Sequence, residues 1–343
     1  MEEVSAGSQI TKIRNYHRGF IATHLINIGA KLGVFEALNE AKEGMAISDL
    51  ASKLELHEPY LKIWCETAYG LEILDCDDQG RFKLQPFLDE ILGDRSHFRN
   101  YLGNIALSVD IIGKMLEDYP EYFKTGTIVE TVYTPELSQA VSETTKNVSL
   151  VFFFRIFPKN DQLRQMLERG VRFLDIGCGS GNLIIQLAQA FGKSTFVGVD
   201  PDAYGIEEAR GAVSQRGLAD RVCVENIGSE ALPYAEEFDL ASMVVTLHEI
   251  RPEIRMKAIE NAYRALKAGG YLLILDFPYP SELEDFRNPM YDFGVLDQFF
   301  EACAGFIHLN MDEQNQMLTK AGFKNIQRIP IGKGMFEFVT AVK

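Results

Sequence analysis

The chain has 343 residues, which suggests two domains, because a domain typically holds about 150. It carries 34 basic and 49 acidic side chains, a net charge of −15, and this argues against a protein that wraps nucleic acid or lies on an anionic membrane. No stretch approaches the roughly 18 consecutive apolar residues that cross a bilayer, and the first residues lack the basic-then-apolar order of a signal peptide. We therefore expect a soluble, cytoplasmic protein.

The cysteines are scattered and form no CxxC pair; they are Cys65, Cys76, Cys178, Cys223 and Cys303. This pattern is typical of reduced thiols, and it fits neither a disulfide framework nor a zinc site. No metal site is predicted.

The first part of the chain, residues 1–95, is predicted to be mainly helical. Apolar residues recur at spacings near 3.6 over residues 10–38, which indicates one long amphipathic helix or two. Shorter helices are expected at 49–54 and 59–70, and residues 71–86 alternate around a turn, which predicts a hairpin. Helix, turn, helix and hairpin in this order outline a winged-helix module.

Residues 96–165 have a less regular helical pattern and are expected to link the two halves. The last part, 166–343, alternates apolar strands with helices, which predicts an α/β fold with a mostly parallel sheet covered on both faces. The expected parallel strands are 171–176, 194–200, 221–227, 238–247 and 270–277. Two further strands, 323–331 and 335–343, are close in sequence, so the last strand is expected to be antiparallel.

A glycine-rich turn follows the first of these strands. Gly177, Gly179 and Gly181 let the backbone turn sharply and approach a ligand closely. Asp200 ends the next strand, where a carboxylate can accept both hydroxyls of a ribose. Together they indicate an adenosine-type ligand. The alternative is that the glycines serve only the turn and that Asp200 caps the helix that follows it.

The loop differs from the one that binds dinucleotides, which would have glycine at position 182, where this chain has Asn182. Asp175 places a negative charge beside the loop, which suits a cationic ligand better than a pyrophosphate. Residues 173–181 resemble motif I of the class I S-adenosylmethionine-dependent methyltransferases, and 196–200 resemble the acidic motif that follows it. Later segments, 238–249 and 266–274, also resemble motifs of this Rossmann-like fold.

The first part of the chain adds to the resemblance. Residues 32–38 and the helix–hairpin unit that ends at Pro86 are similar to the dimerisation domain of winged-helix small-molecule O-methyltransferases, which implies a homodimer. The same outline serves transcription regulators that sense a ligand, but the helix that would read DNA carries Glu58 and Glu66 beside Lys62, so no nucleic acid partner is expected. A second alternative is a relative that binds the cofactor without transferring methyl groups.

The resemblance implies which residues hold S-adenosylmethionine. Asp175 and the glycine loop would contact its methionine part, Asp200 its ribose, and Asn226 its adenine, in place of the acid that is common there. The implied set is Asp175, Gly177, Cys178, Gly179, Gly181, Asp200 and Asn226.

His248 and Glu249 follow the strand 238–247, and the resemblance implies a His–acid pair that acts as catalytic base. Histidine suits this role because its pKa lies near neutrality; the alternative is that His248 only forms the pocket wall. Residues 285–308 are rich in aromatic side chains and are expected to cover a small apolar or aromatic, hydroxylated acceptor. The alternative there is core packing of Leu296, Phe299, Phe300 and Phe306, and Glu301 and His308 are candidate further polar groups.

Overall fold

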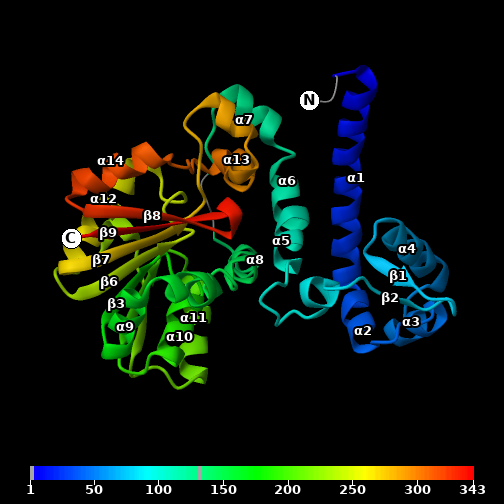
Figure 1. Ribbon diagram of the computed structural model, residues 1–343, viewed down its shortest axis with the longest axis horizontal. Helices are drawn as coiled ribbons and strands as arrows, with labels where there is room; N and C mark the ends of the chain where they lie inside the picture. The colour runs from blue at the N-terminus through cyan, green and yellow to red at the C-terminus, as the bar shows by residue number, and fades with distance from the viewer. Residues whose placement is uncertain (1–3, 130–132) are drawn as a thin grey trace. The chain divides into compact units, whose positions relative to one another are not determined.

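The computed structural model describes residues 4–129 and 133–343. The chain divides into two compact units, Met1–Lys114 and Met115–Lys343 (Figure 1). The division falls within residues 96–165, the segment that was expected to link the two halves.

The first unit is helical apart from one hairpin. Its elements are α1 (Ala6–Lys31), α2 (Val34–Glu40), α3 (Ile47–Leu54), α4 (Glu58–Gly70), β1 (Leu74–Cys76), β2 (Phe82–Leu84), α5 (Leu102–Ala106) and α6 (Gly113–Met115), whose last residue begins the second unit. The helical pattern over residues 10–38, which left one helix or two open, corresponds to two helices, α1 and α2. They are separated at Gly33, whose φ of 73° is the left-handed conformation that glycine adopts freely.

The core of the first unit gathers around Trp64. Its ring packs on Phe35 with centroids 5.6 Å apart, and its indole N–H donates to the carbonyl of Leu25 at 3.0 Å. This bond satisfies the polar atom of a buried tryptophan and holds α4 against α1.

No single helix in the described ranges is both long and apolar enough to cross a bilayer. Helices α1 and α2 reach that length and composition only as a pair, and the pair is bent by 67°.

The second unit contains a seven-stranded sheet in the order β5-β4-β3-β6-β7-β9-β8. The strands are β3 (Arg172–Ile176), β4 (Thr195–Asp200), β5 (Val222–Asn226), β6 (Phe238–Val244), β7 (Leu266–Asp276), β8 (Lys324–Ile331) and β9 (Phe336–Val342). The first five are parallel, and β9 pairs antiparallel with both β7 and β8. The predicted Rossmann-like sheet with an antiparallel last strand is therefore confirmed.

Helices cover both faces of this sheet (Figure 1). The helices of the second unit are α7 (Tyr119–Thr125), α8 (Pro135–Thr145), α9 (Asp161–Arg169), α10 (Asn182–Ala190), α11 (Ala203–Gln215), α12 (Pro252–Ala265), α13 (Asp292–Glu301) and α14 (Met311–Ala321). Side chains of α9, α10 and α11 pack on one face, and those of α12 and α14 pack on the other. Because successive strand residues point to opposite faces, a strand buried on both sides is mostly apolar, and the central strands β3, β4 and β6 follow this rule except at a few polar positions such as Asp175 and Ser242.

The chain order reverses at the centre of the sheet. From β3 it moves outward through β4 to β5, then returns to β6 on the other side of β3. In open α/β sheets such a reversal leaves a crevice at the carboxyl ends of the two central strands, and ligands bind there. The segments that follow β3 and β6 are the glycine loop and the turn that carries His248.

Candidate functional site

The glycine loop lies directly against the segment that follows β6. Gly177 has φ 76°, and a Cβ on it would lie 2.3 Å from a side-chain atom of Thr246. Gly181 has φ 75° and precedes α10, while the space beside Gly179 (φ 50°) is open to 4 Å. The glycines thus provide the tight turn, the contact with β6 and an open approach for a ligand.

Asp175 is a buried carboxylate beneath this loop. It is 2% exposed, and its Oδ1 accepts a hydrogen bond from Ser242 Oγ at 2.5 Å. Burial raises the pKa of Asp175 to about 7, the Ser242 hydroxyl lowers it, and the nearby charge of Asp200 raises it further. An unpaired carboxylate at this depth is costly, so Asp175 presents a negative charge that a cationic ligand would stabilise.

Asp200 ends β4 beside the loop. Its Oδ2 accepts the backbone N–H of Gly179 at 2.8 Å and its Oδ1 that of Asp202 at 2.8 Å. Burial raises the pKa of Asp200 to about 6, and these two hydrogen bonds oppose that rise. The residue that caps α11 is Asp202, which accepts from the backbone of Tyr204, so the capping alternative for Asp200 is wrong. Asn226, at the end of β5, donates to the carbonyl oxygen of Asp200 at 2.9 Å.

Cys178 contributes its backbone to the loop and its thiol to the core. Its N–H donates to Val199 at 3.1 Å, and its Sγ occupies the place that a side chain on Gly198 would need. Burial raises the pKa of this thiol well above its ordinary value. Cys178 is therefore a packing residue with an unreactive thiol.

His248 lies in the turn after β6 and pairs with Asp276, the last residue of β7. His248 Nδ1 and Asp276 Oδ1 are 2.6 Å apart, and both side chains are buried. Burial by itself lowers the pKa of His248, but the carboxylates of Asp276 and Glu301 reverse this and hold it well above the usual value. Burial likewise tends to raise the pKa of Asp276, and the His248 ring holds it below its ordinary value. The pair occupies Nδ1 and leaves Nε2 3.7 Å from one carboxylate oxygen each of Asp297 and Glu301.

The acid that the sequence singled out beside His248 was Glu249. This residue is exposed, whereas the acid hydrogen-bonded to His248 is Asp276. The backbone between β6 and His248 also turns unusually, because Val245 has φ 51°, a conformation that a β-branched residue adopts only when its surroundings impose it.

Helix α13 brings further polar groups to His248. Asp297 and Glu301 lie one turn apart and are 8% and 9% exposed, whereas Leu296 and Phe299 are 68% and 54% exposed. The helix therefore buries acids and exposes apolar side chains, so the core-packing alternative is wrong for Leu296 and Phe299. His308 follows the helix and is 2% exposed.

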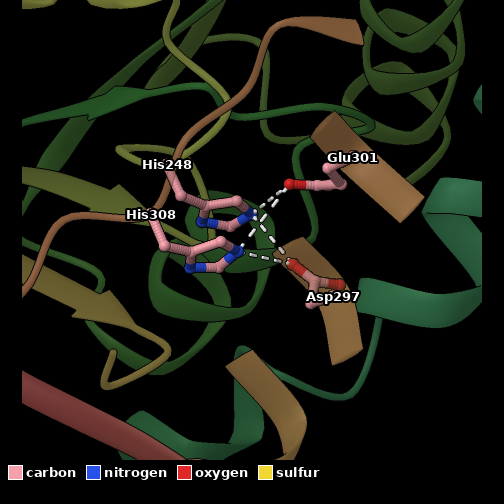
Figure 2. Close-up of side chains that lie close together, drawn as sticks. All are labelled: His248, Asp297, Glu301 and His308. Carbon is pink, nitrogen blue, oxygen red and sulfur yellow. Dashed lines mark hydrogen bonds and ion pairs between the residues drawn. The ribbon is translucent and has the colours of Figure 1, made fainter. Parts of the chain in front are cut away.

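The four side chains of His248, Asp297, Glu301 and His308 form one cluster (Figure 2). The two imidazole rings stack with centroids 4.5 Å apart and 10° between their planes. His308 Nε2 lies 2.9 Å from Asp297 Oδ2. The sequence named Glu301 and His308 as candidates but missed Asp276 and Asp297. Asp276 could have been found as the acid at the end of the strand 270–277, whereas nothing in the sequence distinguishes Asp297.

Comparisons with known proteins agree with this geometry. Residues 173–270 match the family model of a methyltransferase domain, and residues 15–87 match that of the O-methyltransferase dimerisation domain. A methyltransferase of Synechocystis, itself uncharacterized, is 31% identical over 180 residues, which cover 51% of this chain and 77% of that protein. The chain belongs to the S-adenosylmethionine-dependent methyltransferases. The expected fold, cofactor and enzyme class are thereby confirmed.

Solved methyltransferases share the fold along the whole chain. A putative O-methyltransferase from Nostoc punctiforme superposes with a TM-score of 0.78 at 18% identity, covering 100% of both chains. Human N-acetylserotonin methyltransferase, solved with S-adenosylmethionine, superposes with a TM-score of 0.73 at 15% identity, covering 100% of this chain and 99% of that one. The alternatives of a DNA-binding regulator and of a relative without methyl transfer receive no support from these comparisons.

Proposed function

We propose that this methyltransferase transfers the methyl group of S-adenosylmethionine to a hydroxyl oxygen of a small, largely aromatic molecule. The observation that carries the proposal is the buried His248–Asp276 pair, with nitrogen and oxygen 2.6 Å apart, at the same sheet edge as the glycine loop. A hydroxyl acceptor must lose a proton during transfer, and an oriented imidazole can receive it in its neutral form, whose share grows with pH because Asp276 and Glu301 raise the pKa of His248.

In this proposal the residues at the carboxyl ends of β3, β4 and β5 would hold the cofactor. The buried charge of Asp175 attracts the cationic methionine part, and the free lone pairs of the Asp200 carboxylate accept the ribose hydroxyls. Asn226 stands next to Asp200 in the strand register and would border the adenine. The open space beside Gly179 supports a close approach of the cofactor to the backbone.

The reaction is a direct displacement. A lone pair of the acceptor oxygen forms a bond to the methyl carbon, and the carbon–sulfur bond breaks with its electrons passing to sulfur, which leaves S-adenosylhomocysteine. The hydroxyl proton passes to His248 Nε2, since Asp276 occupies Nδ1. The protein's contribution is to align oxygen, carbon and sulfur and to exclude water.

The surroundings of His248 favour an aromatic acceptor. Phe277 lies 5.4 Å from the His248 ring and 4.6 Å from that of Phe293, and Tyr279 stacks on His308 at 5.5 Å. A cavity of about 110 Å³ beside Asp276 is bordered by Phe277, Tyr279 and Tyr291 on one side and by the polar side chains of Asp312, Gln314 and Glu337 on another. Aromatic walls with polar side chains beside them suit a flat ring that carries hydroxyl groups.

We also infer that the protein is a homodimer that pairs through α1. On this helix Phe20, Ile21 and Ile28 are 59%, 45% and 49% exposed, within the segment that matches the dimerisation domain. Apolar side chains that share one helix and remain exposed are typical of a protein–protein interface. The amphipathic pattern of residues 10–38 would then place these apolar side chains in the dimer interface.

The test measures cofactor binding and transfer separately. Calorimetry with S-adenosylmethionine should show binding by the wild type and its loss in Asp200→Ala, while His248→Ala should bind the cofactor normally and fail to methylate hydroxylated aromatic acceptors. Normal binding by Asp200→Ala would refute the ribose assignment. Full turnover by His248→Ala would reduce that residue to a pocket wall.

A further inference from the structure

We propose that Arg255 is a positioning residue for the catalytic histidine, because its guanidinium ties the turn that carries His248 to the segment that carries His308. The histidine turn comprises residues 245–250, between β6 and α12. Arg255 belongs to the first turn of α12, and no pattern in the sequence distinguishes it. Its consequence for catalysis rests on the proposed function.

Arg255 is buried without an acidic partner. It is 2% exposed, and it forms no ion pair with any carboxylate in residues 4–129 and 133–343. Arginine is almost never buried to this extent unless it is paired. Burial lowers the pKa of Arg255, and the nearby charges of Asp276, Glu313 and Glu253 oppose this fall. The guanidinium remains charged, since arginine keeps its proton in proteins, so its burial requires strong hydrogen bonds.

The guanidinium donates to three backbone carbonyls. Nε donates to the carbonyl of Ile250 at 2.8 Å, and Nη2 donates to those of His248 at 3.0 Å and Ile307 at 2.7 Å. Two of these carbonyls belong to the histidine turn, and the third directly precedes His308. Hydrogen bonds from a charged donor are roughly twice as strong as neutral ones. One side chain therefore joins two segments that lie far apart in the sequence.

The carbonyls of the histidine turn need this donor. Strand β6 ends at Val244 and α12 begins at Pro252, so the turn lies outside both the sheet and the helix. Buried backbone carbonyls must nonetheless be paired, and His248 and Ile250 are 2% and 7% exposed. Within the described part of the chain, Arg255 is the donor that pairs both of them.

The His248 ring is thus held at two places. Asp276 Oδ1 lies 2.6 Å from Nδ1 and holds the ring itself, while Arg255 holds the backbone that carries it. Val245, at the start of the turn, has φ 51°, a conformation that its surroundings must impose. The bonds from Arg255 to the carbonyls of His248 and Ile250 anchor the chain just beyond that residue.

His308 is held in a similar way and packs on His248. Its backbone N–H donates to Gln298 Oε1 at 2.6 Å, and its Nε2 lies 2.9 Å from Asp297 Oδ2. The two imidazole rings stack with 10° between their planes, as Figure 2 shows. Because Arg255 bonds to both backbones, it fixes their separation, and the stacked ring restrains His248 further.

This placement matters because His248 must receive the hydroxyl proton while the acceptor oxygen attacks the methyl carbon. A displacement of about 1 Å in such an arrangement lowers the rate about 100-fold. The residues proposed to hold the cofactor belong to the glycine loop and to β3, β4 and β5, and Arg255 donates to none of them. Loss of Arg255 should therefore lower kcat and leave the KM for S-adenosylmethionine unchanged.

Arg255→Lys and Arg255→Met test the geometry and the charge. Lysine keeps the charge, but as a point charge it cannot reproduce the planar fork that reaches three carbonyls, and methionine removes both the charge and the donors. Both variants should lower kcat about 10- to 100-fold with an unchanged KM for the cofactor. The matched control is Lys257→Met, which removes an exposed cation from the same helix and should keep the wild-type kcat.

Proton NMR reports the placement of the His248 ring without an acceptor. The proton between His248 Nδ1 and Asp276 Oδ1, which are 2.6 Å apart, should resonate far downfield, and its absence from His248→Asn assigns it. The resonance should be lost or shifted in Arg255→Lys and kept in Lys257→Met. In the wild type itself, the side-chain N–H protons of Arg255 should exchange slowly with solvent, because they are buried and hydrogen-bonded.

Thermal unfolding and calorimetry with S-adenosylmethionine show which variants fold. The positioning role is refuted if the Arg255 protons of the wild type exchange rapidly, or if a folded Arg255→Lys keeps both the resonance and the wild-type kcat. A raised KM for the cofactor with an unchanged kcat would also refute it. A resonance lost from folded Arg255→Lys, when the wild type methylates no oxygen acceptor, would support the positioning role and refute the proposed function alone.

Discussion

Asp175 offers the sharpest test of how the cofactor site works, through the substitution Asp175→Asn. The carboxylate is 2% exposed and has one neutral donor, Ser242 Oγ, at 2.5 Å. Asparagine has the same shape, and its oxygen can accept the same hydrogen bond. The variant therefore removes a buried charge and little else.

The magnitude follows from the pKa. A rise in the pKa of Asp175 from 3.8 to about 7 corresponds to at most about 4 kcal/mol, at about 1.4 kcal/mol per pKa unit. Because the folded pKa is raised, the protonated carboxyl favours folding, and that contribution is lost as pH rises through about 7. The free energy of unfolding of Asp175→Asn should therefore exceed that of the wild type above pH 7, by up to about 4 kcal/mol, and the difference should shrink toward pH 4.

The same variant should bind S-adenosylmethionine about 10- to 100-fold more weakly, the usual loss when a charged partner is removed. The assays are urea denaturation followed by circular dichroism at several pH values, and calorimetry with the cofactor. Ser242→Ala is the matched control, and it should destabilise the protein above pH 7, because the charge then loses its donor. An Asp175→Asn protein that is less stable than the wild type at pH 8, or that binds the cofactor equally well, would refute the reasoning.

Three further outcomes are expected. Gly177→Ala should lower the free energy of unfolding by about 2 to 4 kcal/mol in urea denaturation. Its methyl group would lie 2.3 Å from the side chain of Thr246, and its backbone would have to adopt the left-handed conformation. Unchanged stability would contradict the loop geometry. Asp276→Asn should reduce kcat about 100-fold or more in a methyl-transfer assay, because the orientation of the His248 ring is lost. The KM for the cofactor should stay constant. A rise in that KM with unchanged kcat would argue against a role of Asp276 in orienting His248. Phe20→Glu should convert a dimer to monomers in analytical ultracentrifugation, whereas Lys42→Glu should not; a dimer that persists in Phe20→Glu would exclude this face of α1.

The sheet was predictable because its strands are buried on both faces. Such strands are mostly apolar runs bounded by helices, and a run such as 171–176, in which four of six residues are apolar, favours a buried strand. The glycine loop was predictable because three alternating glycines directly after a strand indicate a sharp turn with positive φ, and Asp200 was predictable as the acid that ends the next strand.

The polar cluster could not be predicted in the same way. Its residues come from the turn after β6, from α13 and from the loop beyond it, and only the fold brings them together with Asp276 at the end of β7. Helix α13 was the most misleading segment, because Leu296 and Phe299 have the spacing of a core face, yet the buried face holds Asp297 and Glu301. Local patterning assumes that the apolar face is the buried one, and that assumption fails where buried acids serve a site.

The central claim, methyl transfer to oxygen at the His248–Asp276 pair, is tested most directly by following the methyl group itself. The wild type and His248→Ala are each incubated with S-adenosylmethionine labelled with carbon-13 in its methyl group and a set of hydroxylated aromatic acceptors. Carbon NMR of the products should show an O-methyl ether signal with the wild type and none with His248→Ala, which still binds the cofactor. A label found only on carbon or nitrogen, or an equal ether signal from His248→Ala, would contradict the account.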